Sequence, residues 1–444
     1  MKLFNWFQTP RIMLLCVLVA AASLTCYAQN PPTSIDRENA REMLDSIKSD
    51  LQKNYYDPNF RGMNVDERFK VATEKTRQAE SLAQLLGIVG QVLLDLDDSH
   101  TFFLPPARTY RTDYGWQMKA IGARCYVSAI KPGSDAEGKG LKEGDEVVSV
   151  DGLKPTRENL WKILYLYHSI RPRPGMRLIV KRPDGTEQQL DVAAKIREGK
   201  KVVDLTAAGQ GYDSSELIRD QERFAHLNRH RYVDLGDVFV WKMPGFDMTK
   251  TQTKDFAGKF RNRKVLILDL RGNGGGYEEM LLALIGSVFN REVRVGDLKR
   301  RKEQKPMIAT SSGDNAFAGK IFVLIDSESG SASELFARVL QLEKRGTVIG
   351  DRSAGAVMRS RFYSHTLGID RAIPFGVSIT DADIIMTDGQ SLEHVGVIPD
   401  ELKLPSAADM AAKRDPVLAY TLSLVGIDMS PEKAGALFPV EWVR

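Results

Sequence analysis

The sequence of 444 residues predicts a multi-domain α/β protein whose core contains a largely parallel β-sheet. Two apolar runs, residues 265–268 and 321–325, are typical of strands buried on both faces. Each run leads into a turn of small residues and then into a segment with apolar residues at helical spacing. Repeated strand–turn–helix units of this kind favour a sheet in which neighbouring strands run in the same direction.

Residues 1–28 have the features of a secretory signal peptide. Lys2 and Arg11 precede a short apolar run, and the small residues Cys26 and Ala28 suit cleavage after Ala28. The run is shorter than the roughly 18–20 residues that a membrane-spanning helix needs. We therefore expect export, most simply to the periplasm, with no transmembrane helix in the mature chain. A lipoprotein attached through Cys26, an extracellular protein and an uncleaved anchor are the alternatives.

Composition excludes several classes of partner. The chain has 62 basic and 58 acidic residues, a net charge of +4, and the basic residues are scattered among acids. This pattern argues against a nucleic-acid or membrane-surface partner.

Cys125 is the one cysteine outside the signal segment, so we expect no internal disulfide. No Cys/His cluster has metal-site spacing, and we expect neither a metal nor an organic cofactor. The oligomeric state stays open.

Residues 29–111 are predicted to be mainly helical. Thr33 and Asp36 fit a capping box, and the apolar residues between 40 and 51 then mark one face of a helix. Further helical patterns cover residues 66–79 and 82–94. After them, Ser99 and His100 lie where helix gives way to a strand-like run.

Residues 112–198 form a small β-rich unit by their pattern. The run Gly-Leu-Lys-Glu-Gly-Asp-Glu-Val-Val-Ser-Val-Asp-Gly at 140–152 combines a turn, a strand and an Asp-Gly turn. This run resembles the mark of a PDZ domain. The resemblance implies that the unit captures a peptide's C-terminal end as an added strand, with the carboxylate at Tyr114, Gly115 and Trp116. A β spacer that only gates another site is the alternative.

The remaining chain divides by composition into three parts. Residues 199–236 are polar and are predicted to be a linker, in which His226 and His230 are interpreted as solvated surface. Residues 237–405 are the predicted core. Residues 406–444 are a predicted helical tail, with helical patterns at 407–413 and 416–424.

Two turns of the core carry the chemistry. In Gly-Ser-Ala-Ser-Glu at 330–334, Ser331 lies at the start of a helix, where free N–H groups and the helix dipole favour an oxyanion. The alternative is a serine-rich N-cap. The run Asp-Leu-Arg-Gly-Asn-Gly-Gly-Gly at 269–276 lacks the Gly-Lys-Ser/Thr of a phosphate loop and the Gly-x-Gly-x-x-Gly dinucleotide fingerprint.

Both turns resemble signatures of the carboxyl-terminal processing (tail-specific) serine protease family, and Gly-Val-Ile-Pro-Asp at 396–400 resembles its closing motif. The resemblance covers most of the mature chain and implies a crotonase-like α/β core. It implies that Ser331 is the nucleophile and that Gly274 or Gly275, with Ala332, supplies the oxyanion hole. Glycine suits this role because no Cβ then blocks the approach to substrate.

One departure concerns the catalytic base. Ala356 stands where the family usually has a lysine, and no lysine lies between residues 344 and 403. The Ser99–His100 pair instead resembles the serine–histidine pair of the tricorn branch, and a chlamydial member also uses a histidine here. Glu393 matches the glutamate that tricorn places ahead of the closing motif. The resemblance therefore implies His100 as base, assisted by Ser99 and Glu393.

The sequence as a whole predicts a serine endopeptidase that hydrolyses peptide bonds of secreted or periplasmic proteins. Protein or peptide substrates are its expected partners, with C-terminal ends selected if the PDZ-like unit captures them. The alternative is a catalytically inactive protein that binds peptides or apolar ligands on the same scaffold. The missing lysine keeps this alternative open.

Overall fold

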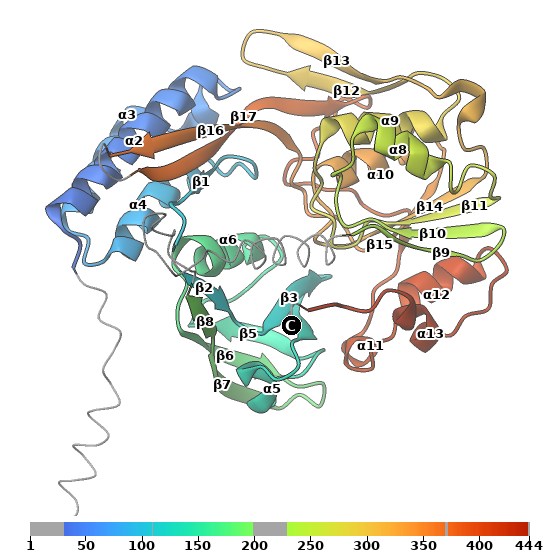
Figure 1. The fold of residues 1–444 in the computed structure, drawn as a ribbon, viewed down its shortest axis with the longest axis horizontal. Coiled ribbons are helices and arrows are strands. Elements are labelled where there is room, and N and C mark those ends of the chain that lie inside the picture. Colours follow the sequence, from blue (N-terminus) through green and yellow to red (C-terminus); the bar gives the residue numbers. More distant parts are fainter. Residues whose placement is uncertain (1–30, 109, 199–228, 369–371, 443–444) are drawn as a thin grey trace, which may run out of the picture.

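The computed structural model describes residues 31–108, 110–198, 229–368 and 372–442, so the predicted signal peptide and most of the predicted linker lie outside the described residues. The described residues form three β-sheets of five or six strands, a two-stranded sheet and surrounding helices (Figure 1). None of the described helices is long and apolar enough to cross a membrane.

The predicted sheet of the core is present, and it is largely parallel. Its six strands are, in spatial order, β18 (Glu401–Leu402), β15 (Thr347–Gly350), β14 (Lys320–Ile325), β11 (Val265–Asp269), β10 (Val238–Lys242) and β9 (Arg231–Asp234). All pairs are parallel except β9 with β10. The prediction that residues up to 236 form a linker is therefore wrong at β9, which extends the sheet by pairing with β10.

Helices cover both faces of this sheet (Figure 1). Successive residues of β10 point to opposite faces, so that Phe239 packs in one cluster and Val240 in another. The first cluster lies under α8 (Lys250–Ala257), α9 (Glu278–Val288) and α10 (Ala332–Leu342). The second lies under the tail helices α12 (Pro416–Ser423) and α13 (Pro431–Leu437), which follow the short α11 (Ala407–Ala411). The sequence did not predict α13.

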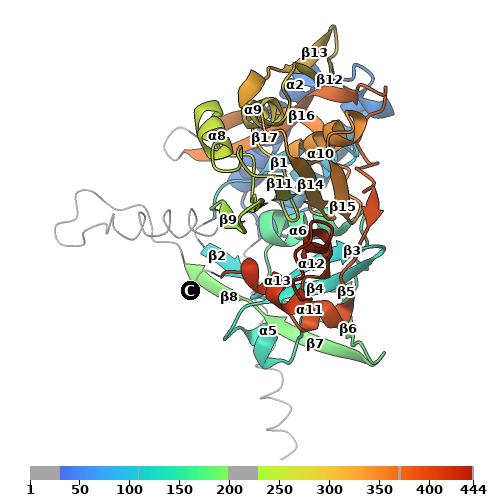
Figure 2. The same cartoon turned by 90° about the vertical axis from the view of Figure 1, so that its right-hand side faces the viewer.

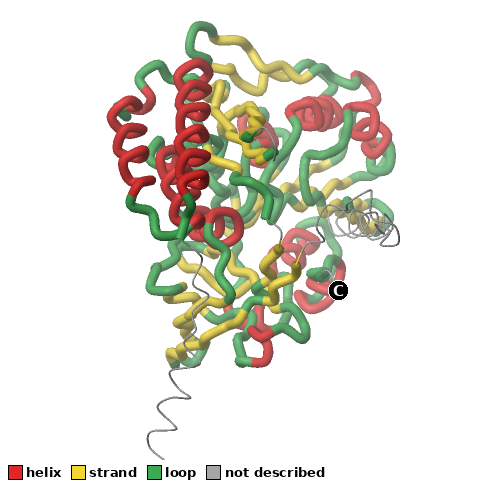
Figure 3. Tube along the Cα trace, turned by 60° about the vertical axis from the view of Figure 1, so that its left-hand side comes forward, coloured by secondary structure: helices red, strands yellow, loops and turns green. Residues whose placement is uncertain are grey.

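A second sheet, which is antiparallel, connects the core to the N-terminal helices. It contains β1 (Phe102–Leu104), β12 (Val293–Lys299), β13 (Gln304–Ala309), β16 (Met358–Leu367) and β17 (Ile373–Met386). The N-terminal helices are α2 (Ser34–Asn54), α3 (Val65–Arg77) and α4 (Leu82–Leu94), with a short turn η1 (Phe60–Gly62). These helices share one apolar cluster with β17, and Figure 3 shows them beside the strands of this second sheet. Because β1 pairs with β17, the residues that follow α4 are held against the core.

The predicted PDZ-like region forms a separate antiparallel sheet with its own apolar core (Figure 2). The strands follow the chain: β3 (Trp116–Ile121), β4 (Arg124–Ile130), β5 (Glu146–Val150), β6 (Gly175–Lys181) and β7 (Glu187–Ala193). Two helices, α5 (Asp135–Gly138) and α6 (Leu160–Tyr165), accompany them, and a π-helical turn, η2 (Leu166–Ile170), continues α6. Strands β2 (Tyr110–Asp113) and β8 (Lys195–Glu198) pair where the chain enters and leaves the unit. Strand β3 is an edge of the sheet.

Candidate active site

Ser331 lies in the turn between β14 and α10 with an unusual backbone conformation. Its φ is 53° and its ψ is −117°, a region that residues with a side chain rarely adopt. The backbone N–H of Ser331 donates to the Ala356 carbonyl at 2.8 Å and to the Glu334 carboxylate at 3.0 Å. These contacts hold the strained turn in place.

Glu334 joins the two loops that meet at Ser331, a role that sequence reasoning missed. Its buried carboxylate accepts hydrogen bonds from the N–H groups of Ser331, Gly355 and Ala356 and from the Ser353 hydroxyl, at 2.6–3.0 Å. Burial raises the pKa of Glu334 to about 7, although these hydrogen bonds act to lower it. The sequence signal that could have revealed this role is the position of Glu334, three residues after Ser331.

His100 faces Ser331 from the loop that follows α4. Its Nε2 is 3.4 Å from the Ser331 Oγ, and its Nδ1 is 2.7 Å from the Ser99 Oγ. The residue is half-buried, and this desolvation lowers the pKa of His100, while the charge of Asp98 opposes that shift. A desolvated imidazole of this kind is neutral near pH 7 and able to accept a proton.

Glu393 completes the chain of contacts through Ser99. One carboxylate oxygen accepts the Ser99 N–H at 2.8 Å, and the other accepts the Ser99 hydroxyl at 2.8 Å and the Val357 N–H at 2.9 Å. Burial raises the pKa of Glu393, and the hydrogen bonds from Ser99 act against that shift. The adjacent His394 lies beside this carboxylate, with its Nε2 2.8 Å from the Asp97 carbonyl oxygen and 3.6 Å from a Glu393 oxygen.

The contacts of Ser99 define the tautomer of His100. A hydroxyl has one proton to donate, and Ser99 donates it to the Glu393 carboxylate. The Ser99 oxygen must therefore accept the proton on the His100 Nδ1. This arrangement leaves the His100 Nε2 unprotonated, with its lone pair facing the Ser331 hydroxyl.

The glycine turn at 274–276 approaches Ser331 closely. A Cβ added to Gly275, whose φ is +103°, would lie 2.6 Å from the Ser331 Cβ and 3.0 Å from the Ala332 nitrogen. The Gly275 N–H itself donates to the Asn273 side chain at 2.9 Å. Within the described residues, the N–H groups of Gly274 and Ala332 have no hydrogen-bond acceptor. Of the two glycines predicted for the oxyanion hole, Gly274 is therefore the one whose N–H has no acceptor within the described residues.

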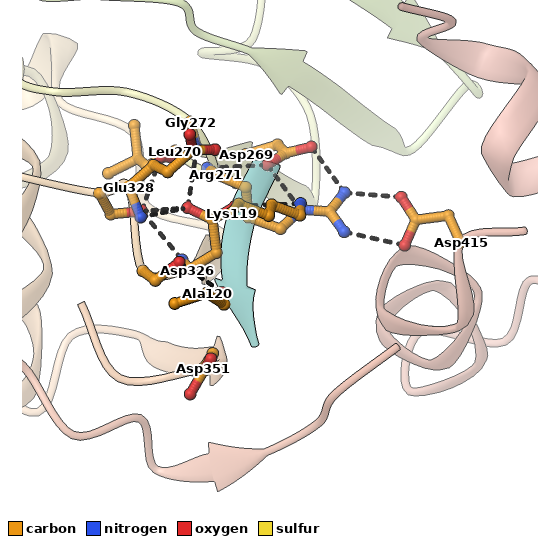
Figure 4. Close-up of polar contacts among 12 residues, drawn as sticks. Lys119, Ala120, Asp269, Leu270, Arg271, Gly272, Asp326, Glu328, Asp351 and Asp415 are labelled. Atoms are coloured by element: carbon orange, nitrogen blue, oxygen red, sulfur yellow. Dashed lines mark hydrogen bonds and ion pairs between the residues drawn. The ribbon is translucent and has the colours of Figure 1, made fainter. Parts of the chain in front are cut away.

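A charged network lies beside the same turn (Figure 4). Asp269 and Arg271 pair with each other, and Arg271 also makes two hydrogen bonds to Asp415 at 2.6 and 2.9 Å. Burial acts to raise the pKa of Asp269, but Arg271 outweighs it and holds that pKa well below its usual range. From β3, Lys119 approaches Asp326 at 3.5 Å. The network joins the glycine turn to α12 and to the PDZ-like unit.

The predicted peptide-binding residues line a cavity of about 540 Å³. Tyr114, Gly115 and Trp116 contribute to its wall, and the tail contributes Trp442, which the sequence analysis did not select. The Gly115 N–H is not free, because it donates to the Asp113 carboxylate at 3.0 Å. The buried Trp116 Nε1, in contrast, has no hydrogen-bond partner among the described residues.

His230 does not lie on the solvated surface, so that interpretation is wrong. Its side chain is largely buried and accepts a hydrogen bond from the Trp241 Nε1 at 3.1 Å, while its other nitrogen contacts Asp247 at 2.7 Å. His226 lies outside the described residues. Among the residues that the structure describes, no group of His, Cys, Asp and Glu could hold a metal ion.

Comparison with known proteins finds a family match in the core. The sequence model of peptidase family S41 matches residues 237–402, the segment that contains both turns and Glu393. The chain is 26% identical over 348 residues to a tail-specific protease of Haemophilus influenzae, covering 73% of the chain and 46% of that relative. It is 28% identical to a carboxy-terminal-processing protease of Bartonella bacilliformis, covering 81% of the chain and 78% of the relative.

The fold is also similar to that of a solved structure. Mature CPAF superimposes with a TM-score of 0.63 at 16% sequence identity, covering 89% of this chain and 100% of CPAF. The chain spans less than half the length of its Haemophilus relative. The structural comparison therefore supports the fold, and the activity of this chain is argued separately from its site.

Proposed function

We propose that this chain is a serine endopeptidase in which Ser331 is the nucleophile and His100 is the general base. One observation carries the proposal: the His100 Nε2 lies 3.4 Å from the Ser331 Oγ. This distance is slightly longer than a formed catalytic hydrogen bond, which commonly tightens when substrate binds. A nucleophile, a base and a group that orients the base are the parts that serine acyl transfer requires.

The proposed reaction has two stages. Ser331 Oγ attacks the peptide carbonyl carbon as its proton passes to the His100 Nε2, and the Ala332 and Gly274 N–H groups hold the resulting oxyanion. His100 then gives the proton to the leaving amine, the C–N bond breaks, and an acyl-enzyme remains. A water molecule attacks the ester with His100 again as base, which releases the acid and restores Ser331.

Ser99 and Glu393 orient the base in this proposal. The hydrogen bonds from the Ser99 hydroxyl to Glu393 and from His100 to the Ser99 oxygen keep the imidazole in the tautomer that can accept a proton from Ser331. Positive charge that develops on His100 is then partly balanced by the Glu393 carboxylate through the shared hydroxyl. No lysine is needed, because a histidine accepts a proton near neutral pH with little adjustment.

We further propose that the PDZ-like unit selects the C-terminal ends of exported proteins. The names of the two relatives, a tail-specific and a carboxy-terminal-processing protease, support this substrate class. The orphan Trp116 Nε1 in the cavity is a donor for a peptide carbonyl or carboxylate. The features of residues 1–28 favour a periplasmic location.

A fluorophosphonate probe tests the proposal against the alternative of an inactive binding protein. The probe should form a covalent adduct at Ser331, located by mass spectrometry of the digested protein. Ser331→Ala should lose both the adduct and casein hydrolysis, on the order of 10⁶ in kcat, while remaining folded. Ser312→Ala, in the loop ahead of η3 (Gly313–Asn315), is the matched control and should retain both. A wild-type protein that neither labels nor hydrolyses casein would favour the binding protein.

A further inference from the structure

A buried carboxylate lies two residues before His100, and the reaction described above does not use it. Asp98 is 1% exposed. Its Oδ1 accepts the His100 N–H at 2.9 Å and the Thr380 hydroxyl at 2.6 Å, and its Oδ2 accepts the Tyr55 hydroxyl at 2.9 Å. The sequence analysis did not select Asp98, which lies in a run rich in acidic residues.

The three partners of Asp98 come from three parts of the fold. Tyr55 ends α2, Thr380 lies in β17, and His100 is on the same loop as Asp98. Thr380 is itself bound to the buried Thr101 through its N–H at 3.0 Å and its hydroxyl at 3.1 Å. The carboxylate therefore fixes the His100 loop between the N-terminal helices and the core sheet.

The hydrogen bonds indicate that Asp98 is ionised. All three partners are donors, and an acceptor-only carboxylate satisfies them without a proton of its own. Among the described residues, no Lys, Arg or His forms an ion pair with Asp98. Its negative charge is thus held in a buried environment close to His100, where electrostatic interactions are stronger than in water.

We infer that Asp98 is a positioning residue for the reaction, which fixes the His100 loop and stabilises the imidazolium that forms when Ser331 gives up its proton. The Tyr55 hydroxyl, at the end of α2, donates a hydrogen bond to Asp98 and thereby weakens the effect of the Asp98 charge on His100. This inference rests on the proposed function and adds to it, because Glu393 acts through Ser99 whereas Asp98 binds the backbone N–H of His100 and places its charge close to that residue.

Other charged groups also face the His100 loop, and their effect on the pKa of His100 must be considered when variants are compared. Arg61 donates to the Asp97 carbonyl and lies 3.3 Å from the His394 Nε2, and that nitrogen is 3.6 Å from a Glu393 oxygen. Of the charged groups nearby, Asp98 is the one that acts to raise the pKa of His100 against the effect of burial. The titratable groups on or facing the loop are Tyr55, Tyr56, Arg61, Asp97, Asp98, Lys162, Glu393 and His394.

Direct titration of His100 tests the inference. The chain has six histidines, so histidine-labelled full-length protein gives few NMR signals, and His100→Ala assigns the relevant one. Asp98→Asn keeps the shape but removes the charge, so the pKa of His100 should fall. Tyr55→Phe leaves the charge and removes a donor to it, so the pKa of His100 should rise. A purely structural role for Asp98 would not produce opposite shifts.

Kinetic measurements provide the second readout. Asp98→Asn should lower kcat on the order of tenfold with little change in KM, since the imidazolium that Asp98 stabilises forms only as the reaction proceeds. Unchanged titration of His100 in a folded Asp98→Asn variant would overturn the inference. If Asp98→Asn does not fold, a fall or no change in the pKa of His100 in Tyr55→Phe would overturn it. Absence of fluorophosphonate labelling in the wild type refutes the proposed function instead, and the titration remains measurable.

Discussion

Replacing Gly275 by alanine should damage both the stability and the activity of the protein. The new Cβ would lie 2.6 Å from the Ser331 Cβ and 2.9 Å from the Gly330 carbonyl oxygen, closer than such atoms approach in proteins. Forcing apart a packed contact of this kind costs about 1–3 kcal/mol. The φ of +103° adds strain of about 1–3 kcal/mol for a residue with a side chain. Together, the free energy of unfolding should fall by about 2–6 kcal/mol.

Relief of the clash must move Ser331 or the glycine turn, and the rate should fall accordingly. A displacement on the order of 1 Å in a reacting group costs about 10²-fold in rate, so kcat should fall by at least that factor in the molecules that remain folded. Urea unfolding followed by circular dichroism measures the loss of stability. Hydrolysis of a fluorogenic peptide, with fluorophosphonate labelling to count intact sites, measures the loss of kcat.

Two other glycine substitutions separate the effect of the steric clash from the effect of backbone strain. A Cβ at Gly274 meets no atom within 4 Å, so Gly274→Ala should change the free energy of unfolding by no more than about 1 kcal/mol. A Cβ at Gly236 is equally unobstructed, but its φ is +79°, so Gly236→Ala reports backbone strain without a clash. The reasoning is refuted if Gly275→Ala is no less stable than Gly236→Ala and labels at the wild-type rate.

Three further outcomes are expected. His100→Ala should reduce kcat nearly as much as loss of the nucleophile, whereas Glu393→Gln should cost less; normal turnover by His100→Ala would point to another base. Trp442→Ala should raise KM for peptides with a free C-terminus and spare kcat, and equal KM values for free and amidated peptides would reduce the PDZ-like unit to a spacer. Burial acts to raise the pKa of Asp415, but Arg271 holds it low, so the stability from this pair is present at neutral pH and lost as the pH falls below about 4. Unfolding of Asp415→Asn should therefore depend less steeply on pH between about 5 and 3, and an unchanged slope would contradict this reasoning.

Much of the local structure follows from neighbouring residues, so it could be predicted. The buried strands β11 and β14 were readable as unbroken apolar runs, and the helical periodicity of residues 82–94 matches α4. The position of Ser331 at the start of α10 was predicted for the same reason, since a strand, a turn of small residues and a helical pattern are contiguous. The resemblance to a protease family then pointed to residues distant in the chain, and the choice of His100 as base remains a prediction.

The sequence by itself determined where strands and helices form, which turns carry chemistry, and that Ala356 cannot be a base. Only the tertiary structure decided which loops meet. The Ser331 and His100 side chains are 231 residues apart in the chain, and β1 brings them together by pairing with β17. The buried acids Glu334 and Asp98 could not be interpreted in advance, because the role of a carboxylate depends on the donors that distant segments bring to it. Hydrophobic periodicity is local, but hydrogen bonding in the interior depends on which distant surfaces are buried together.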